Sequence, residues 1–183
     1  MEYGKPQKLP DGRYFLKISG ARHQVNGLVL QDAPSSKAVN FTVADPALFQ
    51  NVDADLLAKA KESKLEWFGK ELSDETINNA FQESVTDGVL GASLWTNKGE
   101  IVTTAFDTKA NPVELADIKE NTPCDVVFEL SGLWFLKKSF GPIWRAIQIR
   151  VRSGPKFEPP KTYLFTDTIM DDQVETDPAD LID

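Results

Sequence analysis

Aromatic and basic side chains gather between Asp125 and Arg152, and they are the residues best suited to bind a ligand. Two of the four Trp residues, Trp134 and Trp144, lie in this stretch. An indole ring stacks on a nucleobase, and guanidinium or ammonium groups hold phosphates. These residue types therefore favour binding of a single-stranded nucleic acid.

The residues after Pro142 alternate in type, which predicts a strand with two unlike faces. Ile143, Ile147, Ile149 and Val151 share the apolar face, with Arg145 as the exception, while Trp144, Ala146, Gln148, Arg150 and Arg152 share the other. A turn at 138–142 joins this strand to the preceding one. The candidate nucleic-acid-binding residues are Trp134, Lys137, Lys138, Phe140, Trp144, Gln148, Arg150, Arg152, Arg13 and Lys17. Weaker candidates are Tyr14, Phe15, Trp95 and Lys98.

A competing interpretation makes the same aromatic residues part of the core. Trp134 and Trp144 would then pack against each other or under neighbouring helices, because Trp side chains are often largely buried. Arg150 and Arg152 would be ordinary charges facing solvent. The neighbouring pair Trp67 and Phe68 is better explained as an anchor for a helical insertion.

Catalysis has little support in the composition. The chain has one His and one Cys, whereas zinc sites usually draw on several of these residues. His23 lies in what we interpret as a strand end and polar turn. Asp53 and Asp55 resemble a pair of metal-binding carboxylates, but they lie near a helix start, where capping explains them. We therefore expect no enzyme, no metal and no cofactor.

The net charge of −8 is unevenly distributed. Seven acidic residues and no Lys or Arg lie between Asp167 and Asp183, which leaves 28 − 7 = 21 acidic against 20 basic residues elsewhere. Seven basic residues and one acidic residue lie between Ser131 and Lys161. The body is near neutral with a basic strip, so the net charge does not exclude a nucleic-acid partner.

Periodicity and turn residues predict the elements that position these groups. Strands are expected at 13–19, 28–30 (after a turn at Asn26 and Gly27) and 39–43, and helices after Pro46 and after Ser73. A hairpin over 92–106 turns at 97–99, and the stretch 125–152 follows it. This order predicts a mainly β (α+β) fold, an OB-fold-like small barrel with a helical insertion.

The domain organisation follows from these elements. We expect a flexible arm at 1–11, one domain at 12–165 with the helical insertion at 45–88, and an acidic disordered tail at 166–183. No apolar run approaches the ~20 residues of a membrane span. We expect no signal peptide and, from the single Cys, a reducing, intracellular setting.

Two segments resemble single-stranded DNA-binding proteins of large double-stranded DNA viruses. The segment 65–77 resembles their EWFGK-x-L-S-x-E-x-I pattern, and 130–141, with Trp144, Arg145 and Gln148, resembles their aromatic and basic hairpin. The resemblance implies an OB-fold that coats unwound DNA during viral replication.

We expect a sequence-nonspecific protein that binds single-stranded DNA and protects it in replication, recombination or repair, at replication sites in an infected cell. A homo-oligomer is compatible with the sequence. The acidic tail would cover the protein's own cationic groove, dock replication proteins, or only aid solubility. The alternative is an interaction module that recruits a replication or transcription partner through an OB-like groove or the tail.

Overall fold

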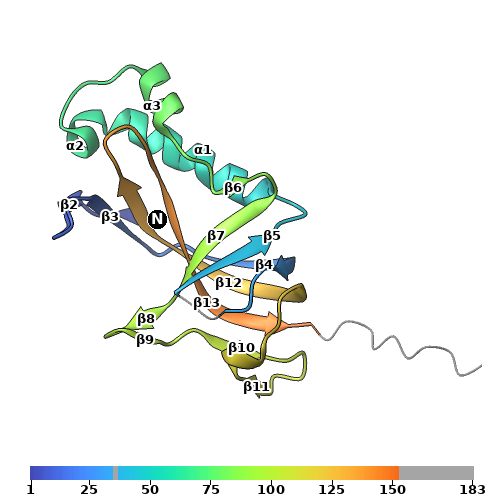
Figure 1. Ribbon diagram of the computed structural model, residues 1–183. Helices are drawn as coiled ribbons and strands as arrows, with labels where there is room; N and C mark the ends of the chain where they lie inside the picture. Colours follow the sequence, from blue (N-terminus) through green and yellow to red (C-terminus); the bar gives the residue numbers. More distant parts are fainter. Residues whose placement is uncertain (35–36, 153–183) are drawn as a thin grey trace, which may run out of the picture.

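The computed structural model describes residues 1–34 and 37–152 (Figure 1). Strands are the main regular structure, and they surround one core. The strands are β1 Glu2–Tyr3, β2 Gln7–Lys8, β3 Tyr14–Ser19, β4 Arg22–Leu30, β5 Ala38–Thr42, β6 Val85–Thr86, β7 Val89–Leu94, β8 Thr96–Asn97, β9 Glu100–Ile101, β10 Thr104–Phe106, β11 Pro112–Val113, β12 Thr122–Phe135 and β13 Phe140–Val151. The helices are α1 Ala47–Glu62, α2 Lys64–Phe68, α3 Asp74–Ala80 and the 3₁₀-helix η1 Leu115–Asp117. The predicted tail at 166–183 lies outside the described residues.

Five strands close the barrel in the order β12, β4, β5, β7 and β13, because β13 pairs back onto β12. The β7–β13 pair is parallel and the other four pairs are antiparallel. A small five-stranded barrel of this kind is the OB-like architecture. The predicted mainly β fold with a helical insertion is confirmed.

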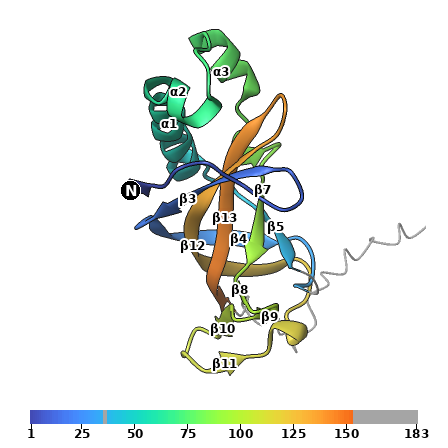
Figure 2. The same cartoon turned by 90° about the vertical axis from the view of Figure 1, so that its left-hand side faces the viewer.

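The helical insertion lies at one end of the barrel, beside the β12–β13 turn, and β8 to β11 lie at the other (Figures 1 and 2). Phe49 of α1 is fully buried and meets the rings of Phe128 and Trp144 edge-on, at centroid distances of 6.0 and 5.2 Å. Such contacts add to the free energy gained by burying the rings. In the described residues, no helix is long and apolar enough to cross a bilayer.

Capping and turn residues set several element ends as predicted. Ser73 Oγ accepts a hydrogen bond from the Thr76 N–H at 3.1 Å and caps α3. Lys98 and Gly99 both have positive φ, +49° and +90°, between β8 and β9. That pair of angles is typical of a tight hairpin turn that matches the strand twist.

The predicted turn at Asn26 and Gly27 is wrong, because these residues form a bulge within one continuous strand, β4. Cys124 pairs with Leu28, and Val126 with Val25, so two residues of β4 face one of β12. Gly27 has a φ of +74°, which a glycine at a bulge tolerates.

A second bulge overturns the predicted faces of β13. Val127 pairs with Gln148 and Phe128 with Ala146, which leaves Ile147 as an extra residue on β13. One extra residue moves the side chains on either side of it to opposite faces. Ile149 faces the core as predicted, but before the bulge the core residues are Trp144 and Ala146. Ile143 and Arg145 therefore point outward.

Candidate nucleic-acid interface

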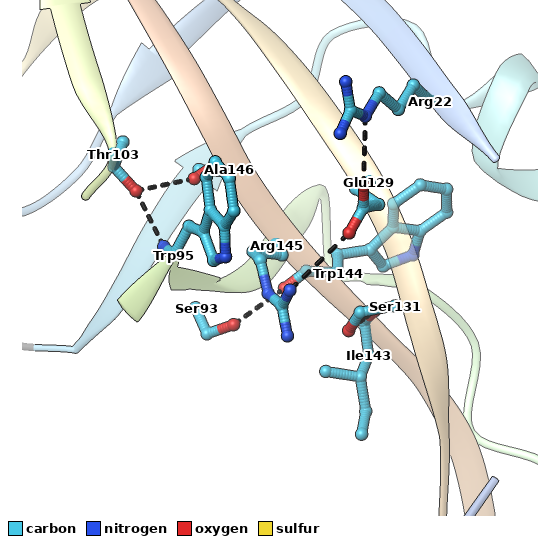
Figure 3. A network of polar contacts seen from close by, with 10 residues as sticks. All are labelled: Arg22, Ser93, Trp95, Thr103, Glu129, Ser131, Ile143, Trp144, Arg145 and Ala146. Carbon is cyan, nitrogen blue, oxygen red and sulfur yellow. Dashed lines mark hydrogen bonds and ion pairs between the residues drawn. The ribbon is translucent and has the colours of Figure 1, made fainter. Parts of the chain in front are cut away.

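Outward side chains of β3, β12, β13 and β7 form a continuous surface on the barrel wall. Pairing puts Arg145 opposite Ser93, and it puts Lys17 opposite Gly132, which pairs with Ile143. We call this surface the outer strand face, and it comprises Lys17, Ser93, Trp95, Trp134, Ile143 and Arg145. Figure 3 shows Ser93, Trp95 and Arg145 on one side of the sheet, with the indole of Trp144 on the other. The surface combines aromatic rings with cationic groups.

Trp95 is held in place through its backbone, and the residue is 36% exposed. The backbone N–H of Trp95 donates to Thr103 Oγ1 at 2.7 Å, and the Thr103 hydroxyl donates to the Ala146 carbonyl at 2.7 Å (Figure 3). The Trp95 carbonyl accepts from the N–H of Val102 at 2.7 Å. A rigidly mounted, exposed indole is a suitable stacking platform.

Glu129 orients two guanidinium groups across three strands. Its carboxylate lies 3.0 Å from Arg22 Nε and 3.5 Å from Arg145 Nη1. Arg22 on β4, Glu129 on β12 and Arg145 on β13 share one cross-strand row. Two positive charges against one negative charge leave this row net cationic, and the fixed guanidinium planes suit contact with phosphates or bases.

Trp134 lies outward on β12, half-buried, and its indole rests against the backbone of β13. A Cβ at Gly141 would come 3.0 Å from Trp134 Cζ2. Between β12 and β3, a Cβ at Gly132 would come 2.5 Å from Phe15 Cε2. The two glycines therefore let aromatic rings lie flat across the sheet beside the outer strand face.

Trp144 and Phe140 do not lie on an exposed face, which corrects their placement on the predicted binding surface. Trp144 is 2% exposed, and Phe140, stacked on Phe135 at 5.6 Å, is 1% exposed. Trp144 Nε1 donates to Ser84 Oγ at 2.7 Å, and Ser84 Oγ donates to Asp53 Oδ1 at 2.5 Å. Burial raises the pKa of Asp53, although hydrogen bonds from Ser84 oppose the shift. This network ties α1 to the barrel.

Arg150 and Arg152 are exposed but already paired. Both guanidinium groups bond to Asp125, with Arg150 Nη2 at 2.6 Å and Arg152 Nη2 at 2.7 Å. Asp125 also accepts from the Gly27 N–H at 3.0 Å, so its carboxylate closes the β4 bulge. Near them, Gln148 bonds to Thr104 at 3.2 Å. This end of β13 holds the fold together, and like the Arg22–Glu129–Arg145 row it keeps one net positive charge.

Replacing Asp125 with Asn is expected to destabilise the protein by about 2–3 kcal/mol at neutral pH, because hydrogen bonds to a charged group are lost. Burial alone would raise the pKa of Asp125, but hydrogen bonds from Arg152, Arg150 and Gly27 outweigh it and lower that pKa. A lowered pKa adds stability above the unfolded value of about 3.9, and this stability disappears as the pH falls through the folded value. The difference between wild type and variant in urea unfolding should therefore shrink below about pH 4.

Asp11→Asn is the matched control for this prediction. Asp11 also pairs with an arginine, Arg13, but that pair is exposed on the surface. Its loss should change stability little. A D125N variant as stable as wild type at neutral pH would contradict a structural role for the carboxylate.

Lys137 and Lys138 are exposed in the β12–β13 turn, away from the strand faces. They lie at a groove of about 570 Å³ between this turn and the helical insertion. Phe68, Leu136 and Tyr14 also line it, with Leu136 54% and Tyr14 46% exposed. In the described part of the chain, neither lysine forms an ion pair, so both ammonium groups are available to an anionic ligand.

The ten candidate residues therefore do not form one site. Trp134 and Lys17 lie on the outer strand face, whereas Arg13 is paired with Asp11 near the start of β3. The alternation predicts a core position for Arg145 and Ile143, and it gives no signal for Arg22. The signal for Arg145 was its charge on a predicted core face, where an unpaired guanidinium is costly.

The matching family model covers residues 26–167 and is described as a family of unknown function, DUF5871. None of the curated proteins matches the chain.

Solved structures similar to this chain include single-stranded DNA-binding proteins of bacteriophages. The gp2.5 protein of bacteriophage T7 has a TM-score of 0.50 and 11% identity, over 80% of this chain and 99% of that one. The protein of bacteriophage Enc34 has a TM-score of 0.49 and 10% identity, over 89% and 97%. At this identity the T7 match shows the fold alone. The resemblance to proteins of large double-stranded DNA viruses stays a prediction.

Proposed function

We propose that this chain, which belongs to the DUF5871 family of unknown function, binds single-stranded DNA on the outer strand face. One observation carries the proposal: two outward indoles, Trp95 and Trp134, share this face with the guanidinium of Arg145. One structural neighbour, the protein of bacteriophage Enc34, has been solved in complex with single-stranded DNA. For this chain, the support is the combination of stacking rings and a cationic group on one surface.

In this proposal, aromatic side chains contact the bases and basic side chains contact the phosphates. Bases stack on Trp95 and Trp134, and each stacked base is worth about 1–3 kcal/mol whatever its sequence. Arg145, Arg22 and Lys17 meet the phosphates, and Lys137 and Lys138 extend the cationic track at the turn. This arrangement needs no cofactor, metal or catalytic group. The finer roles we propose are protection of unwound DNA during replication, recombination or repair, at replication sites in an infected cell.

Affinity for single-stranded DNA is expected to fall steeply with salt, because phosphate contacts release counterions. Three to five such contacts predict a slope of log K against log salt of about −2 to −4, at roughly −0.7 per contact. Fluorescence anisotropy with a labelled oligothymidine, titrated at several salt concentrations, measures it. A slope near zero would contradict a phosphate-contacting site.

Removing the acidic segment is expected to strengthen binding several-fold at low salt. A chain that ends at Thr166 lacks seven acidic residues that repel DNA or compete with it. The gain should vanish at high salt, where charges are screened. A full-length chain with those seven residues changed to Asn or Gln separates charge from length. Equal affinity of all three chains would contradict a regulatory tail.

A second candidate function is docking of a partner protein, and the groove at the β12–β13 turn favours it. Aromatic and apolar side chains line the groove together with Lys70, Lys137 and Lys138. This chemistry fits an acidic partner segment that carries apolar side chains. Anisotropy of a labelled peptide with the sequence of residues 161–183 tests this function. The double variant Lys137→Glu, Lys138→Glu reverses the charge of the groove and should weaken peptide binding. Peptide binding without DNA binding would favour this function over the first.

A further inference from the structure

A hollow of about 320 Å³ opens beside Trp134 on the barrel wall. Trp134 and Pro142 line it from β12 and β13, and Val89 and Gly91 line it from β7. Its volume lies at the lower end of the ~300–1,000 Å³ of small-molecule sites. It is therefore large enough for one flat ring system and small enough to exclude an extended chain.

The buried lining of the hollow has no spare hydrogen-bond donor. Ser84 and Trp144 line it, but Trp144 Nε1 donates to Ser84 Oγ and the Ser84 hydroxyl donates to Asp53. Glu83, an exposed lining residue, makes no ion pair with any other described residue. Gln82, Thr86 and Trp134 line the hollow with N–H or O–H donors, and Glu83 adds a carboxylate that repels a phosphate, so the hollow favours a neutral base over an anion.

Gly91 lines the hollow without adding a side chain to it. A Cβ at Gly91 would meet only Asn40 Oδ1, at 3.5 Å, which is ordinary contact. The backbone there does not require glycine, since no positive φ is found at this position. A glycine inside a strand often marks a place where a ligand approaches closely.

We propose that this hollow holds one nucleobase of a bound single strand, stacked against Trp134. The inference rests on the proposed single-stranded DNA binding and adds a base pocket to it. Glu83 accepts hydrogen bonds only, as does a carboxylate that reads the amino group of cytosine in DNA. The pocket therefore prefers a base with an exocyclic amino group, such as cytosine, over thymine.

Gly91→Val narrows the hollow without removing a charge or an indole. We expect it to weaken binding of an oligodeoxycytidine by about 5-fold or more, the lower end of a lost base stack. On an abasic oligomer of the same length, wild type and variant should bind equally. This comparison separates loss of a base pocket from a disturbed DNA path.

Glu83→Ala gives a second measurement, which holds even if Gly91→Val does not fold. It should weaken binding of oligodeoxycytidine while leaving oligothymidine unchanged. Anisotropy titrations of the three proteins with the three oligomers give every ratio. Equal losses on all oligomers, or no loss with either variant, would overturn the base pocket and leave single-stranded DNA binding standing. If wild type binds no oligomer at low salt, the proposed function fails and the pocket with it.

Discussion

Replacing Trp144 with Ala is expected to lower the free energy of unfolding by about 3–5 kcal/mol, the usual cost of truncating a buried Trp. Trp144 is among the largest fully buried side chains, and its ring meets those of Phe49, Phe128 and His23 edge-on. The change also removes the Nε1 bond to Ser84 at 2.7 Å and leaves a buried hydroxyl one partner short. Urea unfolding measures the loss.

Trp95→Ala is the matched control for that experiment, because Trp95 is an exposed indole on the same barrel. It should change the free energy of unfolding by less than about 1 kcal/mol. A Trp144→Ala protein that keeps its stability but loses DNA affinity would contradict the buried position of this side chain.

The double variant Trp95→Ala, Trp134→Ala is expected to bind single-stranded DNA at least about 30-fold more weakly, since each lost stack costs about 1–3 kcal/mol. Both indoles lie on the outer strand face, and within the described residues neither indole N–H donates a hydrogen bond. Anisotropy with oligothymidine measures affinity, and circular dichroism checks the fold.

Tyr14→Ala is the matched control for the stacking prediction. Tyr14 is an aromatic residue 46% exposed, but it lines the groove at the β12–β13 turn rather than the outer strand face. Its loss should leave affinity nearly unchanged. Equal affinity of the double variant and wild type would contradict stacking on Trp95 and Trp134.

Local signals in the sequence predicted the fold well. Ser73 caps α3, and Lys98 and Gly99 turn the β8–β9 hairpin, because each depends on a few neighbouring residues. The strand predicted at 13–19 is observed as β3, in which Leu16 and Ile18 are buried. The prediction of a turn at Asn26 and Gly27 failed because the same residue types suit both a hairpin turn and a bulge. Only the pairing with β12 distinguishes the two.

The candidate site was predicted less well, because β13 contains an inserted residue and because ion pairs between distant residues leave no local signal. The extra residue Ile147 reverses the alternation of β13, and periodicity counted from Ile143 cannot detect a single inserted residue. The alternation therefore predicts an outward-facing Trp144 and an inward-facing Arg145, the reverse of what is observed. The burial of Asp125 could not be predicted from the sequence either. The residues next to Asp125 in the chain do not show that Arg150 and Arg152 both pair with it.

Photo-cross-linking maps the DNA path on the outer strand face most directly. A single strand carrying 5-iodouracil, irradiated on the wild-type protein at low salt, forms adducts that peptide mass spectrometry locates. The predicted adducts fall on Trp95 and Trp134. Adducts confined to segments outside the outer strand face, such as β11 and η1, or no adduct at all, would contradict binding on this face.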